Sequence, residues 1–141
     1  MKNCLTIAGS DCSGGAGIQA DLKTFSALGC YGMSAISAVV AENTERVIST
    51  MPVTPSVIYD QLEAVFTDIR VDAVKIGMLP DAGSMHAVAA ALMKFHPEIG
   101  VGDPILAAPA RTELMQGSAV NTFYTTPVPL TTPVSPTIPQ S

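Results

Sequence analysis

Apolar residues near the start of the chain follow two different periods in succession. A short apolar run over Leu5–Ala8 predicts a buried strand. Apolar residues then recur at i, i+4, i+7 and i+10, the spacing of one helix face; they are Ile18, Leu22, Phe25 and Leu28. This spacing predicts a helix over Ala16–Leu28 that ends at Gly29. The chain therefore opens with a strand, a glycine-rich loop and a helix.

Strand and helix patterns continue to alternate along the chain. Strands are predicted over Met33–Val40, Asp72–Met78 and Ile99–Val101, with a weaker extended stretch at Arg46–Thr50 after a turn at Ala41–Thr44. Helices are predicted after Thr54, with Pro55 in the first position, and from Asp81 or Ser84 to Phe95. Strands that alternate with helices form mostly parallel sheets with helices on both faces. We therefore predict a three-layer α/β fold.

The pattern changes toward the last residues. Residues 124–141, YTTPVPLTTPVSPTIPQS, contain five prolines among eighteen residues. Each proline removes a backbone donor, so this segment cannot form a central strand. We therefore divide the chain into a folded unit over residues 1–123 and a Thr/Pro-rich tail over residues 124–141.

Composition and charge narrow the classes of function. The 141 residues are 48% apolar and 13% charged, which suits one packed domain. The formal charge is −5 and the seven Lys and Arg residues form no cluster, so we expect no nucleic-acid partner. Cys4, Cys12 and Cys30 form no C-x-x-C pair, which favours reduced thiols and a cytoplasmic location. No apolar run of about 18 residues occurs, so we expect no membrane partner.

The glycine-rich loop invites comparison with phosphate-binding motifs. Such a loop before a helix offers backbone N–H donors to an anionic or polar ligand. The Walker A motif does not fit, because Gly15 and Ala16 stand where its lysine and hydroxyl residue belong. The segment Gly15–Ala20 fits the dinucleotide motif G-x-G-x-x-G/A, with Glu42 as the acidic residue, so a nicotinamide-dependent oxidoreductase stays an alternative. Residues Ser10–Gly14 make the predicted loop longer than that motif requires.

Four segments together resemble one known family. They are AGSDCSGGAGIQADLKTFSALGCYG, AENT, VDAVKIGML and the Asp-Pro of GDPIL. Over nearly its whole length the chain is similar to the hydroxymethylpyrimidine/phosphomethylpyrimidine kinases of thiamine biosynthesis, in the ribokinase-like superfamily. The resemblance implies transfer of the ATP γ-phosphoryl group, with Mg²⁺, to 4-amino-5-hydroxymethyl-2-methylpyrimidine or its monophosphate. The pyrimidine-binding residues that it implies are Asp11, Gly15, Ala16, Asp21, Glu42 and Met78, with Asp103 on the metal and phosphate side.

The sequence departs from this family's pattern at several positions. Glu42 stands where the family usually has glutamine, and an ionised Glu only accepts hydrogen bonds. Ala110 and Arg111 replace a small Ser-Gly turn. Thr137 and Gln140 replace an Asn and a Glu, of which the Glu helps to organise magnesium and phosphates in the family. The loss of that negative charge is expected to weaken metal binding.

Members of the family continue for about as far again, and that half holds the anion hole, the catalytic base and most of the ATP pocket. We therefore expect no catalytic residue in this chain and no phosphoryl transfer by residues 1–141 alone. A non-catalytic relic fragment stays a second alternative. A sheet without its remaining elements would expose a strand edge, which favours a homodimer.

Overall fold

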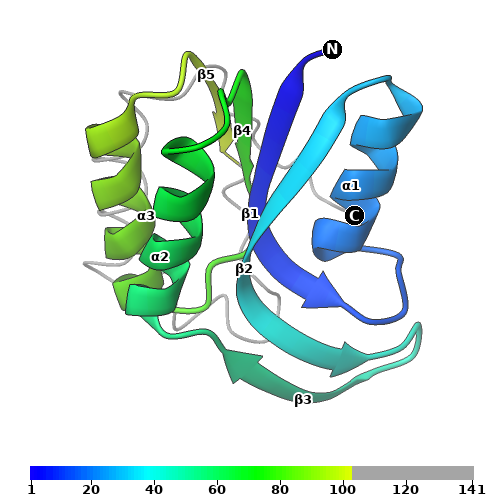
Figure 1. The fold of residues 1–141 in the computed structure, drawn as a ribbon. Helices are drawn as coiled ribbons and strands as arrows, with labels where there is room; N and C mark the ends of the chain where they lie inside the picture. Colours follow the sequence, from blue (N-terminus) through cyan, green and yellow to red (C-terminus); the bar gives the residue numbers. More distant parts are fainter. Residues whose placement is uncertain (103–141) are drawn as a thin grey trace.

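The computed structural model describes residues 1–102, which form a five-stranded sheet between two layers of helices (Figure 1). In chain order the elements are β1 (Asn3–Asp11), α1 (Gly17–Ala27), β2 (Tyr31–Glu42), β3 (Val47–Pro52), α2 (Pro55–Phe66), β4 (Ala73–Ile76), α3 (Ala82–Phe95) and β5 (Ile99–Gly102). Helix α1 covers one face of the sheet, and α2 and α3 pack together on the other (Figure 1). The predicted three-layer α/β architecture is confirmed.

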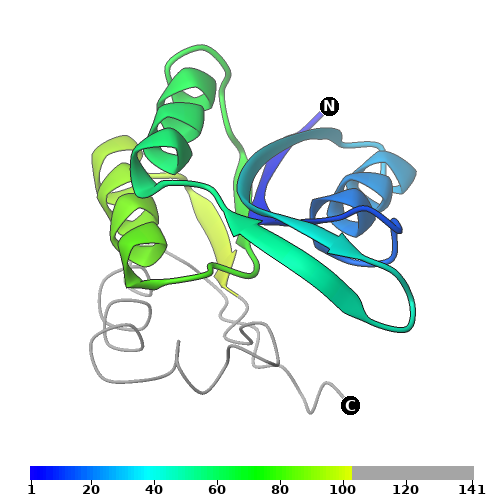
Figure 2. The same cartoon turned by 90° about the horizontal axis from the view of Figure 1, so that it is seen from below.

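The first strand of the chain lies in the middle of the sheet. The strand order is β3-β2-β1-β4-β5. Strand β1 runs parallel to β2 and β4, and β5 runs parallel to β4. Strand β3 pairs with β2 in the antiparallel direction and lies at the edge of the sheet (Figure 2). Because β1, β2 and β4 are parallel, their carboxyl ends share one edge, where Asp11, Glu42 and Gly77 are found.

Helix ends follow the capping signals in the sequence. Thr54 caps α2, where its hydroxyl accepts a hydrogen bond from the Val57 amide and Pro55 occupies the first position. The Asp81 carboxylate caps α3 and accepts from the Ser84 amide at 2.7 Å. Asp81, rather than Ser84, is therefore the residue that opens this helix.

The main core lies between the sheet and helices α2 and α3. Its fully buried side chains come from alternate strand positions and from one stripe of each helix: Leu5, Ile7, Ile58, Leu62, Val74, Ile76, Met85, Val88 and Leu92. On the other face, α1 buries Ile18 and approaches β2 closely. A Cβ atom at Gly32 would lie 2.9 Å from Leu22 Cδ2, so glycine lets the helix pack against this strand.

Several strand boundaries differ from the sequence-based prediction. Strand β2 spans Tyr31–Glu42, so the turn predicted at Ala41–Thr44 begins only after Glu42. Strand β1 extends to Asp11 rather than ending at Ala8, because Ser10 and Asp11 continue the pairing with β2 across an irregular register step. Strand β4 ends at Ile76, so Met78 follows the strand instead of belonging to it. The predicted strand at Ile99–Val101 is confirmed as β5.

Several predictions concern residues outside the described range. They are the metal-side Asp103, the family departures at Ala110, Arg111, Thr137 and Gln140, and the tail at residues 124–141. Within residues 1–102, no helix is long and apolar enough to cross a membrane. The three cysteines are free thiols.

Candidate functional site

The loop after β1 is organised around the carboxylate of Asp11. Its Oδ1 atom accepts hydrogen bonds from the Ser13 hydroxyl at 2.6 Å and the Ser13 amide at 2.9 Å, and its Oδ2 accepts from the Gly15 amide at 3.0 Å. These donors, with the Ser13 hydroxyl first, hold the pKa of Asp11 below its ordinary value, although burial acts in the opposite direction. Asp11 therefore shapes the loop, and sequence reasoning, which assigned it to ligand contact, did not foresee this role.

Two glycines of the loop have different structural roles. Gly17 has a positive φ of 59°, and a Cβ atom there would lie 2.3 Å from the carbonyl oxygen of Gly9. The first turn of α1 can therefore press against β1 only if residue 17 has no side chain. At Gly15 the nearest atom to an added Cβ is Asp11 Oδ2 at 3.7 Å, an ordinary contact. The fold thus requires a glycine at position 17, whereas position 15 has room.

The start of α1 is tied to the end of β1 by a glutamine. The Gln19 side chain accepts a hydrogen bond from the Asp11 amide at 2.8 Å and donates to the Ser10 hydroxyl at 3.0 Å. Ala16 is the N-cap of α1 and supplies no side-chain cap. The first amides of α1 are thus placed beside the loop by Gln19 rather than closed by a capping side chain. This arrangement suits the polar or anionic ligand expected from the sequence.

Glu42 ends β2 beside this loop and is held there by Cys12. The Cys12 thiol donates to the Glu42 carbonyl oxygen at 3.0 Å and accepts from the Glu42 amide at 3.3 Å. Burial, followed by the negative charge of the nearby Asp11, raises the pKa of Glu42.

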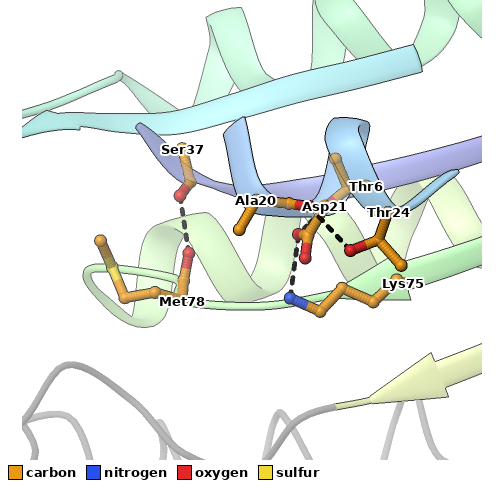
Figure 3. Close-up of polar contacts among 7 residues, drawn as sticks. All are labelled: Thr6, Ala20, Asp21, Thr24, Ser37, Lys75 and Met78. Carbon is orange, nitrogen blue, oxygen red and sulfur yellow. Dashed lines mark hydrogen bonds and ion pairs between the residues drawn. The ribbon is translucent and has the colours of Figure 1, made fainter. Parts of the chain in front are cut away.

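Asp21 lies apart from the loop, in a second polar cluster on the α1 face of the sheet. Its Oδ2 atom accepts a hydrogen bond from the Thr6 hydroxyl at 2.6 Å and lies 2.9 Å from Lys75 Nζ (Figure 3). Thr6 is fully buried in β1, and Lys75 comes from β4. The ion pair therefore joins α1 to two strands, and Asp21 has a clear structural role beside the predicted ligand contact.

Met78 lies where the segment after β4 crosses the end of β1. Its carbonyl oxygen accepts a hydrogen bond from the buried Ser37 hydroxyl at 2.6 Å (Figure 3). A Cβ atom at Gly9 would lie 2.6 Å from the methyl carbon of Met78, so the methionine side chain packs directly on the Gly9 backbone. The absence of a side chain at Gly9 gives Met78 this position.

The predicted site residues therefore fall into three groups. Asp11, Gly15, Ala16 and Glu42 belong to the loop and to the strand ends beside it. Asp21, on α1, contacts Thr6 and Lys75, whereas Met78 follows β4 and contacts Ser37. Sequence reasoning assigned no role to Lys75, Ser13 or Gln19 and missed the Cys12 contact. Ser13 carried a usable signal, since an Asp followed two residues later by Ser is typical of a side-chain-stabilised turn.

The arrangement is that of an α/β protein with a glycine-rich strand–helix loop at the carboxyl edge of its parallel strands, the edge at which open α/β sheets generally bind small ligands. Residues 11–141 match the family described as phosphomethylpyrimidine kinase, and the chain belongs to this family. Its homologues are kinases of thiamine biosynthesis, and its fold is ribokinase-like.

Individual relatives agree with this assignment. The chain is 45% identical to the hydroxymethylpyrimidine/phosphomethylpyrimidine kinase of Escherichia coli over 139 residues, which cover 99% of this chain and 52% of that protein. It is 41% identical to the enzyme of the same name from Bacillus subtilis over 141 residues, again 52% of that protein. The chain thus spans about half the length of the curated relatives that it matches.

Solved structures show the same fold. A phosphomethylpyrimidine kinase from Clostridium difficile superposes with a TM-score of 0.85 at 42% identity, covering 95% of this chain and 58% of that one. Pyridoxal kinase from Staphylococcus aureus, in complex with AMP-PCP, superposes with a TM-score of 0.82 at 34% identity, covering 96% and 49%.

The dinucleotide-binding alternative is not supported, because these relatives are kinases. The argument from loop length, which counted Ser10–Gly14 as part of the loop, was partly wrong. Ser10 and Asp11 belong to β1, so the loop consists of Cys12–Ala16 and is shorter than predicted.

Proposed function

We propose that this chain forms the pyrimidine-binding part of an enzyme that phosphorylates 4-amino-5-hydroxymethyl-2-methylpyrimidine, or its monophosphate, with ATP. The observation that carries this proposal is the family match over residues 11–141. The local geometry supports it, since the match includes the Asp11-centred loop, the uncapped start of α1 and the Met78 segment.

Each part of the proposed site has a role that its chemistry allows. The exposed Gly15 and Ala16 offer backbone to the polar edge of the ring at the start of α1. Met78 supplies an adaptable apolar side chain for the ring face. Asp21, on α1, supplies a carboxylate that Thr6 and Lys75 hold in place (Figure 3). A polar edge and an apolar face together are what recognition of a flat heterocycle requires.

ATP supplies the transferred phosphoryl group in this proposal, and Mg²⁺ would accompany it. Within residues 1–102, no group of three or more His, Cys, Asp or Glu side chains could hold a metal ion. The described residues therefore supply no preformed cluster of three such ligands, and we derive no step through Mg²⁺. Asp103, the expected metal-side residue, lies outside the described range.

Calorimetric titration of residues 1–141 tests the proposed ligand. We expect the aminopyrimidine to bind and NAD to give no heat of binding. Ala16→Leu, an exposed substitution at the loop, should weaken pyrimidine binding at least ~tenfold, about 1.4 kcal/mol. The matched control is Ala27→Leu at the far end of α1, which should leave the affinity unchanged. Equal affinities for both variants, or binding of NAD instead, would contradict the proposed site.

Phosphoryl transfer is the second measurement. We expect residues 1–141, which span about half the length of the curated relatives, to transfer no phosphoryl group from ATP to the pyrimidine by themselves. Charge stabilisation around the moving phosphate is usually the largest catalytic contribution, and the family resemblance assigns the groups that provide it to the other half of the relatives. A coupled assay with ATP and Mg²⁺ measures this. Turnover by the purified chain would show that the catalytic groups lie within it.

A homodimer is the partner arrangement that we propose. Val47, Ile48 and Met51 on the edge strand β3 are 49%, 61% and 63% exposed, and an apolar edge strand is a surface that a second copy can pair with. We propose no nucleic-acid or membrane partner. A cytoplasmic location is also a proposal, supported by the free thiols of Cys4, Cys12 and Cys30; cell fractionation would test it.

A further inference from the structure

Two donors from the sheet converge on one oxygen of the Asp21 carboxylate. The Thr6 hydroxyl donates to Oδ2 at 2.6 Å, and the Lys75 ammonium donates to the same atom at 2.9 Å (Figure 3). Both contacts end on Oδ2, and no donor to Oδ1 is found within residues 1–102. The side chain of Asp21 is 18% exposed, so it is not sealed into the core. Since an ionised carboxylate can accept about four hydrogen bonds, Oδ1 keeps its capacity as an acceptor.

The ammonium of Lys75 lies toward the carboxyl end of β4. A Cβ atom at Gly77 would lie 3.1 Å from Lys75 Nζ and 2.9 Å from the Cβ atom of Ala8. The ammonium therefore lies in the space beside Gly77, which a side chain at that position would enter. Met78, the predicted ring contact, is the next residue of the chain. The Asp21 ion pair is thus next to the segment that carries the proposed ring contact (Figure 3).

Thr6 and Lys75 are well placed to orient the carboxylate because both belong to central strands. Thr6 is fully buried in β1, and Lys75, in the neighbouring β4, has a side chain that is 32% exposed. Asp21 belongs to α1, outside the sheet. Without these donors the carboxylate could adopt several rotamers, and ligand binding would have to select one at a cost in conformational entropy. The two strand residues select that rotamer before the ligand arrives.

We infer that Lys75 and Thr6 are positioning residues for ligand binding: together they hold Oδ2 of Asp21, which leaves Oδ1 to accept a hydrogen bond from the pyrimidine. This inference rests on the proposed function and deepens it, because it assigns a binding role to two residues that act only through Asp21. The proposed ligand carries two donors, an exocyclic amino group and a hydroxymethyl group. An ionised oxygen held in one orientation makes a strong hydrogen bond with either of them.

A double-variant cycle on pyrimidine affinity tests the role of Lys75 in residues 1–141. We expect Lys75→Met to weaken binding about five- to tenfold, which corresponds to roughly 1.0–1.4 kcal/mol. Because Lys75 acts through Asp21, the same change should cause no further loss in a chain that already carries Asp21→Ala. A general loosening of the fold would weaken binding in both backgrounds.

The matched control for Lys75→Met is Lys94→Met on α3. It makes the same chemical change on the opposite face of the sheet from α1 and should leave the pyrimidine affinity unchanged (Figure 1). Equal losses from Lys75→Met in the wild-type and Asp21→Ala backgrounds, or no loss in the wild-type background, would overturn the inference.

Thr6 provides a second test that needs no change at Asp21. Thr6→Val removes the hydroxyl and keeps the shape of the side chain, whereas Thr6→Ser keeps the hydroxyl and removes a methyl group. We expect Thr6→Val to weaken pyrimidine binding about fivefold and Thr6→Ser to stay within about twofold of the wild type. The reverse order would show that packing at this buried position, rather than the hydrogen bond to Asp21, controls the affinity.

A measurement without ligand separates this inference from the proposed function. Urea unfolding of the wild type, Asp21→Ala, Lys75→Met and the double variant gives the coupling between the two side chains. We expect the two losses to be non-additive, and strictly additive losses would overturn the inference whatever the ligand is. Failure of the wild type to bind the pyrimidine while this coupling is present would contradict the proposed function instead.

Discussion

Lys75 Nζ lies 2.9 Å from Asp21 Oδ2, and this ion pair connects β4 to α1 across the face of β1. Thr6, on the strand between them, donates its hydroxyl hydrogen to the same oxygen at 2.6 Å. One carboxylate oxygen therefore receives donors from two strands while belonging to a helix. Since half-buried charges need such partners, the contact fixes the first turns of α1, and with them the loop, against the sheet.

Replacing Lys75 by methionine removes the charge and keeps a side chain of similar length. We expect the free energy of unfolding to fall by about 1–2 kcal/mol, because Asp21 loses its counter-charge. The loss should be smaller than the roughly 3–5 kcal/mol of a fully buried pair, because 32% of the Lys75 side chain is exposed. Urea denaturation at neutral pH measures the difference.

The control for Lys75→Met is an ion pair at the surface. Arg70 and Glu98 lie 3.7 Å apart with side chains 75% and 73% exposed. Glu98→Gln should therefore change the free energy of unfolding by less than about 0.5 kcal/mol. Equal losses in Lys75→Met and Glu98→Gln would show that the Asp21 contact adds nothing beyond a surface ion pair.

Gly17→Ala should be among the most damaging small substitutions in the loop. The added Cβ would lie 2.3 Å from the Gly9 carbonyl oxygen, at a φ of 59° that residues other than glycine rarely adopt. We expect a loss of at least about 2 kcal/mol, measured by thermal unfolding. Gly15→Ala makes the same change two residues earlier, where the nearest atom would be 3.7 Å away, and should stay within about 0.5 kcal/mol of the wild type. The reverse order would mean that the close approach at Gly17 is absent in solution.

Because Asp11 is ionised in the folded protein, the free energy of unfolding depends on pH in the acid range. Because its folded-state pKa lies below the ordinary value of 3.8, its contribution is present above pH 3.8 and is lost as the pH falls through the folded-state pKa. Asp11→Asn should therefore lower the free energy of unfolding at neutral pH, and the gap to the wild type should narrow below pH 3.8. Urea unfolding at several pH values follows the gap; a gap that widens in acid would contradict the assigned direction.

The proposed homodimer predicts the effect of a charge on β3. Met51 is 63% exposed and lies opposite Val39, which is 45% exposed, in the β2–β3 pairing. We expect light scattering to show a dimer for the wild type and a monomer for Met51→Lys. Val57→Lys, which places the same charge at a 46%-exposed position on α2, is the matched control and should stay dimeric. A monomeric wild type, or equal effects of both lysines, would remove β3 as the interface.

Much of this fold is predictable because its strands and helices carry clear periodic patterns. The Thr54-Pro55 start of α2 and the α/β alternation follow directly from local chemistry. The burial of individual residues is harder to predict. Val57 is an apolar residue of α2 and is nevertheless 46% exposed, because the core contacts the face that carries Ile58 and Leu62. Periodicity alone does not fix the rotation of a helix to within one residue.

The site was harder to predict than the fold because its roles depend on contacts distant in sequence. The motif indicated a loop around Gly15, but the requirement for glycine at position 17 arises from the Gly9 carbonyl oxygen on the neighbouring strand. Lys75 meets Asp21 across 54 residues of sequence, a pairing that no local pattern indicates. The contacts between the Cys12 thiol and the Glu42 backbone likewise need the register of β1 and β2 to bring the strand ends together.

The central position of β1 has a consequence for synthesis on the ribosome. This strand emerges first, yet its two neighbours are β2 and β4, which are complete only at Glu42 and Ile76. A nascent chain that has emerged only as far as β3 carries β1 with one side unpaired and Leu5 and Ile7 without the helices that bury them. Such an intermediate presents both an open strand edge and apolar surface, the combination that chaperones bind and that drives aggregation. The emergence of α2, β4 and α3 is therefore the step that pairs the open edge of β1 and buries Leu5 and Ile7.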